Sequence, residues 1–353
     1  MISSIIMSSK DNPNYSLNIS LRLSFSGLSL IGSTIIILSY LKFIRLRKFA
    51  FKLIFLLSIS DLIFSISNFL IFEDADQKPA AFCKIQAFFL YFSSISSVFW
   101  TSIIAYSLHH IVTHSSTRKV QKKIQLFCVV GYGIPFCLSI LPFFWSKYGP
   151  RSFVTDASNS WCGIMRDDNI FDKNATIIDS VVRLGPVFCC FIFNVYKYWK
   201  VHVHFKQYNS KTELMDTIDK KIKFFPILPI LCWLIEIVFR ILEVSTNIFV
   251  YKDQQKYDDD LKWLYTLEAI DMVLINSHGL LNFLLYGMTR YVMREWKKLL
   301  SKKKEEDFFT PGNSTNNRKD SWSSCNSEDK GRNDLGSILL RKNEDKLDAD
   351  SSL

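Results

Sequence analysis

The amino-acid sequence predicts an all-α membrane protein built as a bundle of seven transmembrane helices. Two observations carry this prediction. Of the 353 residues, 48% are hydrophobic and 30 are Phe, and the mean hydropathy is positive at +0.12. The apolar residues come in long blocks separated by short charged segments, which is typical of a chain that crosses a membrane repeatedly. This pattern argues against a disordered protein, a disulfide-dense secreted scaffold and a coiled coil.

Seven of these blocks are long enough to span a hydrocarbon core, which takes about 20 helical residues. Helices are expected because backbone groups in lipid must be hydrogen-bonded within the segment, and because the blocks lack the alternation of barrel strands. The expected spans are Ile19–Leu41, Leu53–Phe72, Phe82–His109, Ile124–Phe144, Ile177–Trp199, Phe224–Phe249 and Leu261–Met288.

The loops between the blocks predict the orientation. Loops 42–52, 110–123 and 200–223 are basic, whereas loops 73–81 and 250–260 are predominantly acidic. Because basic loops stay in the cytoplasm, we expect the N-terminus outside and the C-terminal tail inside. The net charge of +10 therefore reflects membrane flanks. It does not indicate a nucleic-acid partner.

The outer side holds two cysteines and three glycosylation sequons, of which the one at Asn18 is expected to stay bare because it lies so near the membrane. Of the eight cysteines, five lie within expected spans and one in the tail, which leaves Cys83 and Cys162 facing the oxidising side. Elimination therefore predicts a disulfide between the third span and the second outer loop. Asn14 and Asn174 begin Asn-x-Ser/Thr sequons on the same side, and we expect them to be glycosylated.

Short motifs at fixed depths narrow the class of protein. They are Leu57-Ser58-Ile59-Ser60-Asp61-Leu62, Cys83-Lys84-Ile85-Gln86-Ala87, Phe99-Trp100-Thr101, Ala105-Tyr106, Trp161-Cys162, Pro229-Ile230-Leu231-Cys232-Trp233-Leu234 with Arg240, Ser277-His278-Gly279-Leu280-Leu281-Asn282 and Tyr286-Gly287. Together with the predicted topology, this set resembles a G-protein-coupled receptor. It is most similar to the cyclic-AMP receptor and cyclic-AMP-receptor-like family of slime moulds and other microbial eukaryotes, over roughly residues 19 to 300.

The resemblance implies a receptor in the plasma membrane with an extracellular small-molecule or peptide ligand and a heterotrimeric G protein as partners. It implies neither catalysis nor a cofactor. Two departures stand out: Leu108-His109-His110 occurs where many receptors have Asp-Arg-Tyr, and the seventh span lacks Asn-Pro-x-x-Tyr. From these departures we expect a poor fit to the large rhodopsin-like class.

Charged residues in the outer half of the spans are the candidate ligand-binding residues, because buried ionisable groups usually face the bundle interior. The candidates are Arg183, Arg240, Glu268 and Asp271. Glu236 lies four residues before Arg240, so a structural ion pair on one helical face is the first expectation for these two. The outer half of the spans holds two arginines and four carboxylates, and this excess of negative charge does not favour an anionic ligand such as cyclic AMP. An amine and a mixed-charge ligand stay equally open.

Polar residues deeper in the spans are candidates for a conformational switch. Asp61 is expected near Ser58, Asn282 and His278, where it would hold a sodium ion or a water network that rearranges on activation. The alternative is a carboxylate that simply accepts hydrogen bonds from neighbouring groups. Trp233 is either a packing residue or a pivot, and only the resemblance favours the pivot.

The predicted organisation is an outer segment 1–18, a receptor domain 19–288, an amphipathic helix 289–300 and a tail 301–353. The amphipathic helix places apolar groups on one face and bases beside them, which suits the lipids of the anionic inner leaflet. The tail is polar and serine-rich, so we expect it to be disordered and open to a kinase or an arrestin-like partner.

A seven-span transporter or channel without G-protein coupling is the alternative function, because charges within spans also mark solute pathways. An opsin would need a lysine within the seventh span, where only Lys262 at the outer edge is present. A metallohydrolase would need several inward histidines. Five of the six histidines lie at the cytoplasmic ends of the expected spans.

Overall fold

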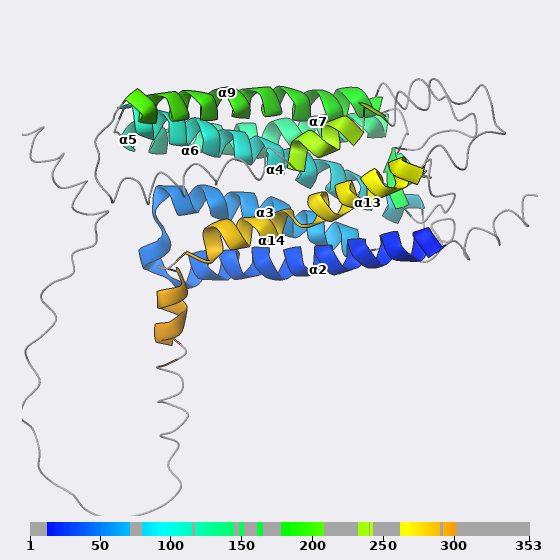
Figure 1. Ribbon diagram of the computed structural model, residues 1–353, viewed down its shortest axis with the longest axis horizontal. Coiled ribbons are helices and arrows are strands. Elements are labelled where there is room, and N and C mark those ends of the chain that lie inside the picture. The colour runs from blue at the N-terminus through cyan, green and yellow to red at the C-terminus, as the bar shows by residue number, and fades with distance from the viewer. Residues whose placement is uncertain are drawn as a thin grey trace, which may run out of the picture. The chain divides into compact units, whose positions relative to one another are not determined.

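The computed structural model describes residues 13–70, 80–114, 117–144, 148–151, 161–164, 178–207, 232–239, 241–242, 262–289, 292–299 and 301. Almost all of these residues are helical (Figure 1). The main helices are α2 (Pro13–Lys42), α3 (Phe49–Phe69), α4 (Ala80–His114), α5 (Arg118–Gln121), α6 (Ile124–Cys128), α7 (Ile134–Phe144), α9 (Gly185–Gln207), α13 (Lys262–Asn276) and α14 (His278–Asn282).

Five stretches of these residues are helical, long and apolar enough to cross a membrane, and they correspond to the first five expected spans. They are Ser20–Lys42, Phe49–Phe69, Ala81–His114, Ile124–Phe144 and Val181–His204. A sixth candidate, Ala269–Asn276 with His278–Gly287, is bent by 49° at Ser277 and corresponds to the seventh expected span. The remaining expected span, Phe224–Phe249, is described at 232–239 and 241–242, which are helical.

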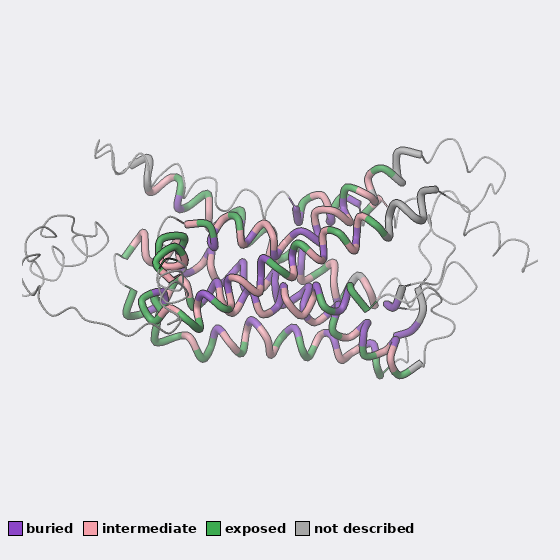
Figure 2. The backbone as a smooth tube through the Cα atoms, turned by 90° about the horizontal axis from the view of Figure 1, so that it is seen from below, coloured by how far each residue is buried: buried purple, intermediate pink, exposed green. Residues whose placement is uncertain are grey.

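Helix α4 is the centre of the packing. It contacts α3, α7 and α9, while α3 also contacts α2, which in turn meets α13 and α14. In its apolar window 67% of residues are buried, against 33% or less in the windows of the other four long helices. Figure 2 shows the buried residues gathered where the helices meet, with exposed residues on their outer sides. The exposed outer sides are apolar, as expected for surfaces that face lipid.

The first and seventh spans approach to backbone contact. A Cβ atom built on Gly32 would lie 2.9 Å from the carbonyl oxygen of Gly279, and one on Gly279 would lie 2.8 Å from the carbonyl oxygen of Ser29. The Gly279 N–H donates to Ser29 Oγ at 2.8 Å, and Ser26 Oγ donates to Asn276 Oδ1 at 2.9 Å. Small residues allow such close packing in membranes, where interhelical hydrogen bonds replace contacts with water.

Three turns of π-helix interrupt the helices in the part of the chain that the structure describes. They are η3 (Val129–Gly133), η4 (Ser180–Leu184) and η6 (Phe283–Gly287). The first two end two residues before Pro135 and Pro186. A proline lacks an N–H and its ring clashes with the carbonyl four residues earlier, so a wider turn relieves both conflicts.

Gly279→Ala should destabilise the bundle, because its methyl group would meet the Ser29 carbonyl oxygen and the hydroxyls of Ser29 and Ser33. We expect a loss of about 1–3 kcal/mol in the free energy of unfolding, as for other overpacked sites. Thermal unfolding of the purified protein in detergent measures it. Gly133→Ala is the matched control, since its nearest neighbour is Val129 Cγ1 at 3.6 Å. Equal stability of the two variants would contradict the close approach.

Candidate functional site

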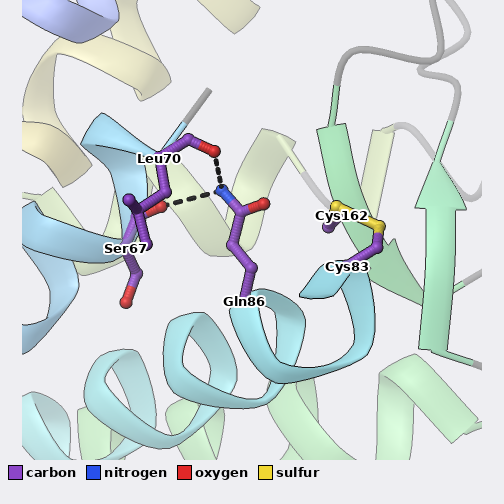
Figure 3. Close-up of a disulfide and its surroundings, with 5 residues drawn as sticks. All are labelled: Ser67, Leu70, Cys83, Gln86 and Cys162. Carbon is purple, nitrogen blue, oxygen red and sulfur yellow. Dashed lines mark hydrogen bonds between the residues drawn. A yellow bond between two sulfur atoms is a disulfide. The ribbon is translucent and has the colours of Figure 1, made fainter. Parts of the chain in front are cut away.

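The outer end of α4 is held by a disulfide and by one glutamine (Figure 3). The predicted Cys83–Cys162 bond is present, with 5.2 Å between the Cα atoms and both side chains buried. One turn further along α4, Gln86 Nε2 donates to the carbonyl oxygens of Ser67 and Leu70, each at 2.9 Å. These contacts join the start of the third span to the end of the second span and to the outer loop.

The loop side of this disulfide is a two-stranded antiparallel hairpin of β1 (Tyr148–Arg151) and β2 (Trp161–Ile164), with Cys162 opposite Pro150. Tyr148 is buried and donates its hydroxyl hydrogen to the Ser139 carbonyl oxygen at 2.8 Å. The hairpin therefore packs on α4 and α7 at their outer ends.

Below the hairpin, Tyr91 of α4 makes two contacts with the start of the fifth span. Tyr91 donates its hydroxyl hydrogen to Asp179 Oδ1 at 2.6 Å. The guanidinium carbon of Arg183 lies 5.9 Å from the centre of the Tyr91 ring, within the range of a cation–π contact. Tyr91 and Asp179 were not among the residues predicted from the sequence.

Arg183 forms a buried ion pair with Glu236 across the fifth and sixth spans. Its Nη2 donates to Glu236 Oε1, and the side chains are 15% and 2% exposed. The spacing along the sixth span predicted Arg240 as the partner of Glu236, and Arg240 lies outside the described residues. Removing one partner of such a pair leaves an uncompensated buried charge, which is strongly unfavourable even where the intact pair contributes little stability.

Trp233 lies one helical turn before Glu236 and contacts the seventh span. Its indole meets the His278 ring edge-on, with 4.7 Å between the ring centres. It is 3% exposed and packs with Val98, Val187 and Ile237. Trp233 packs in the core, and it also lies between the outer ion pair and the seventh span. The packing and the pivot interpretations of Trp233 therefore both stay open.

Asp61 sits at the junction of three helices. It accepts hydrogen bonds from Ser97 Oγ of α4 at 2.9 Å and from Asn282 Nδ2 of α14 at 2.6 Å. Asn282 is one of the neighbours that the sequence predicted, and Ser97 is not. The Ser58 hydroxyl is buried and has no hydrogen-bond partner among the described residues. The His278 ring contacts Trp233, as described above.

Other candidate residues are placed only in part. Asp271 is buried on α13, 2% exposed. The side chains of Asn14 and Glu268 lie outside what the structure describes, as do all of Arg240 and Asn174.

Within the expected amphipathic segment, residues 292–299 are helical. Trp296 Nε1 donates to Ser39 Oγ of α2 at 2.8 Å, and its ring meets Phe43 edge-on at 5.4 Å between centres. These contacts join this helix to the end of the first span. Its position along the inner leaflet stays a prediction.

Asp61→Ala should cost about 1–3 kcal/mol of folding free energy, because the Asn282 amide and the Ser97 hydroxyl lose their acceptor in a buried site. Ser58→Ala on the same helix is the matched control. It removes a buried hydroxyl without a partner in the described structure, so it should be neutral or stabilising. Thermal unfolding of both variants would test this, and equal losses would show that Asp61 has no special place in the packing.

Comparisons with known proteins agree with this architecture. The family model described as "7 transmembrane receptor (rhodopsin family)" matches residues 32–286. The expectation of a poor fit to the rhodopsin-like class is therefore wrong. The seventh span shows one reason: Asn282-Phe283-Leu284-Leu285-Tyr286 keeps the asparagine and tyrosine of Asn-Pro-x-x-Tyr at the same spacing, with Phe283 in place of proline.

The similar curated proteins include slime-mould receptors and a receptor from a plant. The chain is 25% identical over 281 residues to cyclic AMP receptor-like protein A of Dictyostelium discoideum, covering 78% of this chain and 66% of that protein. It is 25% identical over 286 residues to G-protein coupled receptor 1 of Arabidopsis thaliana, covering 76% and 77%. It is 22% identical over 244 residues to cyclic AMP receptor-like protein C of Dictyostelium discoideum, covering 67% and 55%.

The chain thus spans just under two thirds of the first of these relatives and about half of the last. The apolar helices, the Cys83–Cys162 disulfide and the match over residues 32–286 lead to one conclusion. The chain belongs to the seven-transmembrane receptors of the rhodopsin family, as a multi-pass membrane protein that resembles the cyclic AMP receptor-like proteins.

Proposed function

We propose that this receptor lies in the plasma membrane, binds an extracellular ligand in the outer half of its bundle and activates a heterotrimeric G protein. The observation that carries the proposal is the buried Arg183–Glu236 ion pair between the fifth and sixth spans. Charged groups inside a membrane protein are costly, and they usually mark a pathway or a ligand site.

Two side-chain contacts, joined by single turns of helix, lead from this pair into the middle of the bundle. Glu236 lies one turn from Trp233, and Trp233 contacts His278. His278 lies one turn before Asn282 on α14, and Asn282 donates to Asp61. A ligand that changes the Arg183–Glu236 pair therefore acts on side chains that reach the Asp61 junction, which supports coupling between an outer ligand and the inner face.

The end of the bundle that the basic loops assign to the cytoplasm carries suitable chemistry for the inner partners. Lys123 donates to the Tyr106 hydroxyl at 3.3 Å, and Lys197 lies 5.6 Å from the centre of the same ring. Lysines that pack beside an aromatic ring form a positively charged surface, which suits anionic lipids and an acidic protein face. The G protein contacts this surface in the proposal, and the tail recruits the kinase or arrestin-like partner.

Nucleotide exchange on a purified G protein, stimulated by the receptor in nanodiscs, tests the function. The compounds screened are cyclic nucleotides, amines, free amino acids and folate-like compounds. With the first active compound, Arg183→Ala and Glu236→Ala should each raise the half-maximal concentration by about tenfold or more, because each leaves one buried charge without its partner. Val181→Ala in the same turn is the control, since Val181 is exposed at 58%.

An active compound whose potency is unchanged in both ion-pair variants would place the ligand elsewhere. Solute uptake into proteoliposomes without any stimulated exchange would refute the receptor function and favour the transporter.

A further inference from the structure

The Arg183–Glu236 pair and two neighbouring side chains carry buried polar atoms without a hydrogen-bond partner among the described residues. Arg183 Nε, Glu236 Oε2, Trp233 Nε1 and His278 Nε2 have no hydrogen-bond partner in the part of the chain that the structure describes. Leaving such groups unsatisfied costs about 1–3 kcal/mol each. Other buried atoms in the described bundle also lack a partner, and these four differ in lying at or beside one ion pair, where a ligand would supply the missing hydrogen bonds.

These atoms belong to one locus. Arg183 and Glu236 are in contact, and Trp233 lies one turn before Glu236, so that both project from the same side of the helix. The Trp233 ring in turn contacts His278. Trp233 and Glu236 are 3% and 2% exposed, which places the locus inside the bundle. It presents N–H donors from Arg183 and Trp233 and a carboxylate acceptor from Glu236.

The charges of Arg183 and Glu236, taken as a pair, sum to zero, and this restricts a ligand that binds these two residues together. An anion that binds Arg183, or a cation that binds Glu236, brings one net charge into a site of low dielectric constant. An uncompensated buried charge costs several kcal/mol. A ligand with one positive and one negative group leaves the sum at zero and can satisfy both kinds of unpaired atom.

We propose that the ligand is a small zwitterion of the free α-amino-acid type. Its carboxylate accepts hydrogen bonds from Arg183 Nε and Trp233 Nε1, and its ammonium group donates to Glu236 Oε2. This inference rests on the proposed function, since it assigns the ligand of the same outer site. It excludes a cyclic nucleotide, which carries only a negative charge at its phosphate.

Binding to the full-length receptor in nanodiscs tests the proposal, first with the twenty free amino acids. A matched set on one carbon skeleton then separates the charges: leucine, 3-methylbutylamine and 4-methylpentanoate. The apolar neighbours Val98, Val187 and Ile237 around Trp233 are the reason for this skeleton. We expect the zwitterion to bind at least about tenfold more tightly than the amine or the acid.

Two variants should change the preferred charge in opposite directions. Glu236→Gln leaves Arg183 without its counter-charge, so the preference within the set should move to 4-methylpentanoate. Arg183→Gln leaves Glu236 without its counter-charge, so the preference should move to 3-methylbutylamine. Arg183→Lys keeps the charge and should keep the preference for leucine, and Val181→Ala should leave all three affinities unchanged.

Failure to bind any of the twenty amino acids would overturn the proposal. So would a parallel loss of all three ligands in both glutamine variants while Arg183→Lys retains binding, because that result indicates a structural pair. Amino-acid binding without nucleotide exchange would leave this inference standing and refute the G-protein coupling. Exchange that responds to a cyclic nucleotide or an amine but to no amino acid would refute this inference and leave the G-protein coupling standing.

Discussion

The arrangement of the helices depends on the carboxylate of Asp61, which has to find its hydrogen bonds where water is scarce. It obtains them from Ser97 on the third span and Asn282 on the seventh. Because an unsatisfied buried carboxylate is costly, this requirement fixes the rotation and the depth of three helices at once. Helix α4, which supplies one of the two donors, is also the most buried of the five long apolar helices.

Polar contacts at other depths keep the same helices in register. Gln86 and the Cys83–Cys162 disulfide hold one end of α4, and the Trp296–Ser39 hydrogen bond holds the far end of α2. Between these two places, the first and seventh spans touch at Gly279, whose backbone N–H donates to the hydroxyl of a serine on the first span. Apolar surface alone would leave the helices free to slide, because lipid is as apolar as the side chains. These few polar contacts therefore specify the packing.

The sequence predicted the elements well and the contacts between them poorly. Long apolar blocks gave the first five spans, although α4 continues to His114, beyond the block that ends at His109, because a helix does not have to stop where the lipid does. Cys83–Cys162 was predictable from the topology. Asp61 and Asn282 were selected as neighbours, since few carboxylate or amide side chains lie at that depth.

The contact of Glu236 with Arg183 was not predictable in the same way, and the expected pair with Arg240 stays a prediction. Spacing along one helix favours Arg240, whereas the contact with Arg183 depends on how two helices are rotated against each other. Ser97 and Tyr91 carry no local signal either, because Ser and aromatic residues are abundant in these spans. The close approach at Gly32 and Gly279 likewise becomes visible only when the two helices are side by side.

The π-helical turns have a consequence for comparing this receptor with its relatives. A π turn holds one residue more than the regular helix around it, and one residue corresponds to about 100° of rotation. Loss of a single residue from η4 would keep α9 helical but would turn Arg183 away from the sixth span relative to the lipid-facing residues that follow. Alignments of such chains therefore need single-residue gaps inside helices. A change of ligand among relatives can arise from one inserted or deleted codon without any substitution at the contacting positions.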